Sequence, residues 1–383
     1  LALYAAWRAV AEFVPQLGRR WRELALFAGL MVVMVIVGAG LGAVQFIPLY
    51  EVVGQNFRQG SQPYEQIVSY AYPMRRLIAF LVPNFFGSPV EHSYVDLWSG
   101  QTLPTLRDSL GYLKSTEWGM KNYVEGGAYM SLLALLLSLF GVLRRPRRLA
   151  SHAWFCVALG LFSLSLVFGF PTYRLIFALP GINQLHSPFR WVFPYTVCLA
   201  TLAGLGADAL LKGATDPASL KGLRRVFATW DARLSSIMGA LTILAGLGSA
   251  AVVLVLRAFP ERVIPIGDML VRELARANED LSDGRMFLSY EARNLLIFAG
   301  CLLVSGLVLL ARRLLQPGRT LLRRAWMLAV ILVIALDAGA WFRSFTPAVD
   351  PAPLSLRPPS MMFLQQQEGP FRITAYDSRS TKP

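Results

Sequence analysis

The chain has 383 residues, of which 55% are hydrophobic and only 16% are charged, and its mean hydropathy is +0.48. Soluble domains carry about 25% charged residues, so this composition argues against a soluble globular protein. The 37 Lys and Arg residues against 23 Asp and Glu residues give a net charge of +14. Because the basic residues lie between long apolar runs, they indicate the cytoplasmic face of a membrane and not nucleic-acid binding.

The two ends of the chain suggest a piece of a longer protein. It begins at Leu1 without a leader pattern, and the apolar residues 1–14 resemble the tail of an interrupted membrane segment. Residues 371–376 read like the first strand of a domain that the chain only begins. We therefore expect residues 344–383 to be a proline-rich connector and the start of a truncated, β-containing outer domain.

Seven apolar segments are long enough, or nearly so, to cross a membrane. A helical span needs about 20 residues for roughly 30 Å of hydrocarbon, and in lipid only a helix or a closed barrel satisfies the backbone hydrogen bonds. We therefore predict an all-α polytopic membrane domain at 1–343, with spans at about 24–50, 126–143, 153–170, 191–207, 234–256, 294–311 and 325–342.

Basic residues concentrate in alternate connectors. The positive-inside rule places the connectors that hold Arg145, Arg225 and Arg313 in the cytoplasm. The longer connectors then lie on the outer face together with Trp98, Arg190, Arg276 and Tyr376; they are 51–125, 171–190 and 257–293. The first of them is rich in aromatic residues, which predicts interfacial helices at the headgroup level.

No motif for a nucleotide or a metal occurs in the sequence. The glycines of Gly38–Gly42 lie inside an apolar span, where they favour close packing of helices instead of phosphate binding. The histidines are scattered, and the three cysteines lie in apolar stretches without ligand spacing, so we predict no metal site. If the chain is an enzyme, its substrate is energised elsewhere and delivered at the membrane.

The segment 179–191 is the most specific local feature. Arg190 is a cation at headgroup depth just before a span, with His186 and Ser187 as further donors. An arginine there can bind a lipid phosphate through two parallel hydrogen bonds. The alternative is that Arg190 only extends to the interface and that Trp191 belongs to the aromatic belt.

A second polar group lies at the outer end of the first predicted span. Pro48 can open the last helical turn there, which would place Glu51, Asn56 and Arg58 around one mouth. A carboxylate beside a cation suits either a general base or a salt bridge that orders the loop.

Asp337 is an ionisable residue inside a predicted span. Such residues are functional candidates by default, although Asp337 could instead hydrogen-bond a neighbouring helix. We predict that its carboxyl faces other helices, because an unpaired carboxylate in the membrane costs about 2.5–3.5 kcal/mol.

Taken together, the motifs resemble the bacterial YfhO-like membrane protein family. The matching segments follow the order of that family, and they are 44–51, Arg58, 81–87, 123–129, 168–173, 179–181, 187–191 and 206–208. Members of this family look like GT-C-type glycosyltransferases, which use lipid-linked sugars. The resemblance covers most of residues 24–211 and, more loosely, the remaining spans.

The resemblance implies transfer of a sugar from a polyprenyl-phosphate carrier to an envelope glycopolymer or protein on the outer face of the bacterial cytoplasmic membrane. Arg190, assisted by Arg58 and His186, would bind the carrier phosphate. The catalytic carboxylate of such enzymes usually follows the first span and is expected before Leu1, which leaves Glu51, Asp96 and Glu91 as secondary candidates. Nucleic acid is not an expected partner.

Two other classes remain open. A lipid or glycolipid transporter predicts charged residues at mid-membrane depth and inverted repeats. A structural subunit of a larger membrane assembly predicts a broad apolar face for protein partners and no groove for a lipid.

Overall fold

The computed structural model describes residues 2–55, 62–109, 111–118, 127–144, 149–179, 187–212, 223–275, 277, 280–315, 319–342, 359–367 and 369. The chain forms two units, Leu1–Arg343 and Ser344–Pro383. The described part of the second unit contains the short helix α12 (Pro359–Gln365). Most of the predicted proline-rich connector in 344–383 and the predicted strand at 371–376 lie outside the described residues.

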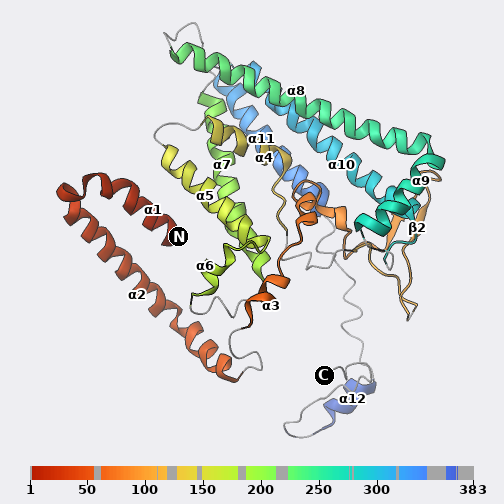
Figure 1. Ribbon diagram of the computed structural model, residues 1–383, viewed down its shortest axis with the longest axis horizontal. Coiled ribbons are helices and arrows are strands. Elements are labelled where there is room, and N and C mark those ends of the chain that lie inside the picture. Colours follow the sequence, from red (N-terminus) through yellow and green to blue (C-terminus); the bar gives the residue numbers. More distant parts are fainter. Residues whose placement is uncertain are drawn as a thin grey trace. The chain divides into compact units, whose positions relative to one another are not determined.

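The first unit is mainly helical (Figure 1). Its α-helices are α1 (Ala2–Phe13), α2 (Leu17–Gln55), α3 (Tyr64–Ser69), α4 (Leu132–Leu143), α5 (Ala150–Val167), α6 (Tyr173–Phe177), α7 (Val192–Lys212), α8 (Leu223–Ala258), α9 (Pro260–Met269), α10 (Gly284–Ala311) and α11 (Thr320–Phe342). Two strands, β1 (Ser93–Val95) and β2 (Thr102–Pro104), form an antiparallel hairpin in which Tyr94 faces Leu103.

Six helical segments among the described residues are long and apolar enough to cross a membrane. They are Gly18–Val52, Ala150–Val167, Pro188–Lys212, Arg233–Ala258, Gly284–Leu314 and Thr320–Phe342. Each of them overlaps a span that the sequence predicts. The prediction of a polytopic helical membrane protein is therefore supported by length and composition.

The one predicted span that these six segments leave out, 126–143, is shorter than expected. The described helix α4 starts only at Leu132 and has 12 residues, which corresponds to about 18 Å. It is an interior helix, because Leu133, Leu137 and Phe140 are fully buried. The described helix thus covers only the second part of the span predicted at 126–143.

Glycines set the closest helix contacts. A Cβ atom at Gly206 of α7 would clash with the carbonyl oxygen of Leu137 in α4, and one at Gly141 of α4 would clash with that of Leu202. The pair α8 and α10, which lie side by side (Figure 1), meets in the same way at Gly239 and Gly306. Small residues thus let the helix backbones touch, as in membrane helix pairs generally.

The glycines that the sequence singled out behave differently. A Cβ atom at Gly38 or Gly40 of α2 would meet no atom within 4 Å, and one at Gly42 would meet only Phe46 of the same helix. None of the apolar window of α2 is buried against the described chain. The expectation that these glycines serve close packing is therefore wrong within the described chain.

The connector between α2 and α4 is not a set of interfacial helices alone. Its described part contains α3, the 3-10 helices η2 (Met74–Phe80) and η3 (Pro83–Phe86), and the β hairpin. Gly87 ends η3 with φ of 79°, and a Cβ atom there would clash with the backbone of Thr116. Its aromatic residues Phe86 and Trp118 pack on Phe287 of α10, so much of its apolar surface is covered by protein.

This connector lies at one end of the helix bundle. It contacts the last residue of α5 through Tyr72, the start of α10 through Asp96, and the end of α11 through Asn84. Its Trp98 also donates a hydrogen bond to the carbonyl oxygen of Leu256 near the end of α8. The charge pattern predicts that all the helix ends in contact with the connector lie on the same side of the membrane. The orientation of the chain in the membrane stays a prediction.

The contact between α4 and α7 gives a direct test of the fold. We expect Gly206→Ala to destabilise the protein by about 1–3 kcal/mol, because the added methyl group has no room against the α4 backbone. Gly204→Ala is the matched control, since a Cβ atom there meets nothing within 4 Å. The measurement is the thermal unfolding midpoint of both variants in detergent. Equal midpoints would contradict the described crossing of α4 and α7.

Candidate functional site

Arg190 lies in a short 3-10 helix that leads directly into α7. This helix, η6 (Pro188–Trp191), has a proline in its first turn, where a missing N–H costs nothing. The Arg190 amide donates to the Ser187 carbonyl oxygen at 3.0 Å. Phe189 is buried while Arg190 is exposed. The residue therefore occupies the place that the sequence predicts, at the end of a candidate span.

The connector packs against this same turn. The Tyr72 ring stacks on Phe189 with centroids 5.3 Å apart and planes at 8°. The Tyr72 amide also donates to the Val167 carbonyl oxygen at 2.9 Å, at the end of α5. These two contacts fix the connector to the end of α5 and to the residue next to Arg190.

Arg76 is a second cation in this region. Its guanidinium lies over the Tyr72 ring at 5.3 Å and over the Phe86 ring at 5.1 Å, and the residue is only 7% exposed. Cation–π contacts of this kind strengthen when water is excluded. Sequence reasoning missed Arg76, and the residues it named instead as partners of Arg190, Arg58 and His186, lie outside the described residues.

Glu117 is the carboxyl that interacts with this buried cation. Burial raises the pKa of Glu117, and the nearby Arg76 partly opposes that shift. Burial likewise lowers the pKa of Arg76, while Tyr72 and Glu117 raise it. A half-buried carboxyl with a raised pKa beside a cation is suited to take up or release a proton. Sequence reasoning also missed Glu117, which carries no local motif.

An apolar cavity of about 520 Å³ opens between α1, α5 and α7 and reaches Trp191, the residue after Arg190. Its walls are mostly aromatic and aliphatic, and include Tyr4, Phe155, Leu159, Phe193 and Val197. A cavity of this size and character is typical of sites for small apolar molecules or lipid chains.

Helix α1 forms one wall of this cavity. The Trp7 indole donates to the Ser151 carbonyl and hydroxyl oxygens at 3.1 and 3.0 Å, and the Tyr4 ring packs edge-on against Phe155 at 5.2 Å. The segment that the sequence reads as the tail of an interrupted span is thus a separate helix that packs on α5.

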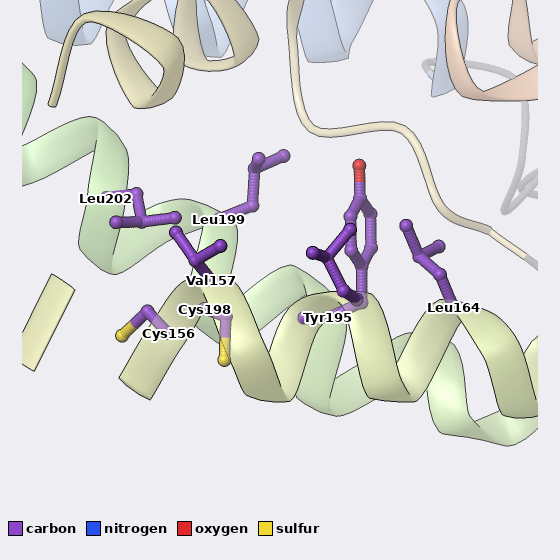
Figure 2. A pocket seen from close by; sticks show the side chains of 9 residues that line it. Cys156, Val157, Leu164, Tyr195, Cys198, Leu199 and Leu202 are labelled. Carbon is purple, nitrogen blue, oxygen red and sulfur yellow. The ribbon is translucent and has the colours of Figure 1, made fainter. Parts of the chain in front are cut away.

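A second, smaller cavity of about 150 Å³ lies between α5 and α7. Figure 2 shows its apolar lining, with Cys156 and Cys198 at one end and the Tyr195 ring farther along. Both thiols are free and buried, as the sequence predicts for cysteines in apolar stretches. The two cavities share these cysteines, so the space between α5 and α7 extends from the larger cavity.

Asp96 serves the fold and is poorly suited to catalysis. Its fully buried carboxylate accepts two hydrogen bonds of 2.8 Å from the Arg285 guanidinium and one of 2.7 Å from the Ser99 amide. The Arg285 hydrogen bond is the main reason why the pKa of Asp96 lies well below its usual range. This carboxylate therefore stays charged and occupied, and it fixes the β hairpin to the start of α10.

The other two acids that the sequence named are Glu91 and Glu51. Glu91 accepts a 2.8 Å hydrogen bond from Arg293 and a longer one from the Tyr290 hydroxyl, both on α10. Glu51 is exposed near the end of α2. No hydrogen bond or ion pair within the described part of the chain links either acid to Arg190.

Asp337 faces other helices, as predicted. It is only 4% exposed, and its two carboxylate oxygens accept hydrogen bonds from the Tyr129 hydroxyl at 2.5 Å and from the Leu132 amide at 2.9 Å. Leu132 is the first residue of α4, so the negative charge of Asp337 lies at a helix N-terminus, where it is favoured. Asp337 thus joins α11 to α4.

A third buried carboxyl, Glu291, was assigned by the sequence to an outer loop. It lies in α10, where it is buried, and Asn294 donates to one of its oxygens at 3.1 Å. Asn294 also donates to the Asn84 carbonyl oxygen at 3.1 Å, and Asn84 donates to that of Trp341. This network links α10, the connector and α11. The loop assignment is wrong because α10 begins at Gly284.

Comparisons with known proteins do not identify a family for this chain. No protein-family model, no curated protein and no solved structure matches the chain. Among the described residues, no three His, Cys, Asp or Glu side chains lie close enough together to hold a metal ion. The case for a function therefore depends on the geometry around Arg190 and on the sequence motifs.

The role of Asp337 can be tested by stability. We expect Asp337→Asn to lower the free energy of unfolding by about 1.5–3 kcal/mol, because charged hydrogen bonds to Tyr129 and Leu132 are lost or weakened. Asp208→Asn is the control, since Asp208 pairs with Lys212 near the surface and such pairs contribute about 0–1 kcal/mol. Thermal unfolding of both variants in detergent is the measurement. Equal, small losses would show that Asp337 does not hold α4.

Proposed function

We propose that this chain is the membrane domain of a GT-C-type glycosyltransferase similar to the YfhO-like family. In this proposal, a sugar passes from a polyprenyl-phosphate carrier to an envelope acceptor on the outer face of a bacterial cytoplasmic membrane. The observation that carries the proposal is the apolar cavity beside α5 and α7, which reaches Trp191 next to the exposed Arg190.

The cavity suits the apolar part of the carrier. Its lining along α7 runs from Trp191 through Phe193 and Val197 to Thr201. Ten residues of helix correspond to about 15 Å, so an isoprenoid chain can lie along the helix while its phosphate stays at the Trp191 end. The apolar lining supports the expected polyprenyl donor as the occupant of the cavity.

The phosphate would then lie beside Arg190. A guanidinium can hold two phosphate oxygens in one plane, which a lysine ammonium cannot do. Arg76 is a further cation of the connector; its guanidinium lies over the Tyr72 ring, and that ring stacks on Phe189, the residue before Arg190. Positive charge of this kind favours an anion over a neutral headgroup.

The transfer would be a substitution at the anomeric carbon of the sugar. A hydroxyl oxygen of the acceptor forms the new bond to that carbon, while the bond to the phosphate oxygen breaks and the lipid phosphate leaves with the electron pair. The growing negative charge on the phosphate is stabilised by Arg190. The hydroxyl proton passes to a carboxylate that acts as the general base.

One observation favours the structural alternative. The long apolar window of α2 is not buried against any described part of the chain, which leaves a face for lipid or for another protein. A structural subunit would use this face for a protein partner. It would not need an apolar cavity that reaches Trp191, the residue next to Arg190.

The proposal predicts a strict need for a planar cation at position 190. We expect Arg190→Lys in the full-length protein to lower sugar transfer by at least about tenfold, because it keeps the charge but loses the two-pronged donor. Arg262→Lys is the control, since Arg262 is an exposed arginine that stacks on Phe259 in another connector. Transfer to the envelope acceptor is measured at matched expression. Wild-type transfer by Arg190→Lys would remove Arg190 from the site.

A further inference from the structure

Helix α9 follows the candidate span of α8 almost without a break. Only Phe259 separates the two helices; its φ of −127° and ψ of 56° are not helical, and Pro260 opens α9. The chain bends there, and α9 turns away from the direction of α8 (Figure 1). Because the apolar window of α8 lies in Arg233–Ala258, α9 begins at the depth where the span ends.

The exposed side of α8 is apolar up to this bend. A Cβ atom at Gly239 or Gly246 would touch α10, whereas Leu241 and Val255 lie on the opposite side of α8 and are exposed. Phe259 continues this exposed side, because its amide donates to the Val255 carbonyl oxygen at 3.1 Å, one helical turn away, and it is exposed too. Since α8 is long and apolar enough to cross a membrane, we expect this stripe to face lipid.

Helix α9 has one face against the protein and one outward face. A Cβ atom at Gly267 would clash with the backbone of Gly284 at the start of α10, and Asp268 Oδ1 accepts a hydrogen bond from the Gly284 amide at 2.6 Å. The outward face carries Ile266 and Met269, which are 52% and 48% exposed. A single exposed apolar side chain is ordinary, but these two lie one turn apart on the same face.

Phe259 joins the exposed side of α8 to the outward face of α9. The Arg262 guanidinium lies over the Phe259 ring at 5.7 Å, so the first turn of α9 stays beside the exposed end of α8. Ile266 and Met269 follow Arg262 at spacings of four and seven residues, which places all three on one face. The apolar stripe of α8 therefore continues through Phe259 onto α9, and a bilayer that contacts α8 also reaches α9.

We infer that α9 is a membrane-surface helix that inserts Phe259, Ile266 and Met269 into the boundary between the headgroups and the acyl chains. The partner is the lipid bilayer, in the leaflet at this end of α8. Helices with one apolar face bind membranes in this way. Because the other face of α9 packs on the start of α10, contact with lipid also positions the helix that holds the β hairpin through Arg285. This surface does not depend on the proposed sugar transfer.

The test places one environment-sensitive fluorophore, NBD, on α9 of the full-length protein. The native cysteines are replaced by serine, Ile266→Cys or Met269→Cys is labelled, and the protein is reconstituted in nanodiscs of phosphatidylglycerol and phosphatidylcholine. We expect the emission of NBD at either position to shift to the blue. We also expect it to lose intensity when the lipids carry bromine near the headgroup end of their acyl chains.

Glu261→Cys is the matched control. Glu261 is an exposed residue of the same helix, and at about 100° per residue it points about 140° away from Ile266. NBD at this position is expected to be quenched by iodide in the water and not by the brominated lipids. Equal quenching of the Ile266 and Glu261 positions by iodide would overturn the inference, because the outward face would then meet water. A blue-shifted label at Ile266 that brominated lipids do not quench would also overturn it, because a protein would then cover this face.

A second measurement uses the wild-type protein and covers the case in which the cysteine variants do not fold. A phospholipid that carries a diazirine close to its headgroup is photo-activated in the same nanodiscs, and the labelled peptides are identified by mass spectrometry. We expect label on residues 259–269 as well as on α8. Label on α8 without label on 259–269 would contradict the inference, because the reagent would have reached this part of the bundle without meeting α9.

Discussion

The ion pair between the buried Asp96 carboxylate and the partly exposed Arg285 is the interaction on which the connector between α2 and α4 depends. A fully buried carboxylate is costly unless it is paired and hydrogen-bonded, and Arg285 and Ser99 satisfy it from two sides. Because Asp96 directly follows β1, the pair fixes the hairpin to the start of α10. The stabilisation is complete above the usual carboxyl pKa, and it is lost progressively as the pH falls from that value to the lowered pKa of Asp96.

The same connector also contacts α5 and the turn before α7, where the candidate site lies. Tyr72 lies between its backbone contact with Val167 of α5 and its ring contact with Phe189 before α7. Arg76, one turn later, places its guanidinium over the Tyr72 ring. The apolar cavity begins at Trp191, the residue after Arg190. A cationic end and an apolar body thus adjoin, which is the pattern that a lipid phosphate with a long tail requires.

The sequence predicts the centres of the helices well and their ends poorly. Apolar windows locate the part of a helix that contacts lipid or core, but α10 begins at Gly284 because Asp283 accepts a hydrogen bond from the Met286 amide. The first turns of α10 carry Arg285 and Arg293, whose acidic partners come from the connector. A hydropathy pattern cannot find a polar helical turn whose partners lie almost 200 residues away in the chain.

Two features of the candidate site and its surroundings could be predicted from the sequence. The position of Arg190 before an apolar run is visible in the sequence, as is the need of Asp337 for a partner. Arg76 and Glu117 were not visible, because their significance comes from burial and from contacts across the connector fold. The apolar cavity was equally hidden, since α1 contributes a wall to it through tertiary contacts with α5.

The central claim is that a lipid tail lies in the cavity beside α5 and α7. The most direct measurement is photo-crosslinking of the full-length protein, in lipid nanodiscs, with a polyprenyl phosphate that carries a diazirine on its chain. The account predicts labelled peptides from the cavity lining, around Phe155 and Val197, and a loss of label in Val197→Trp but not in Ala200→Trp, which lies outside the lining. Label confined to α8 or α11, or unchanged by Val197→Trp, would contradict it.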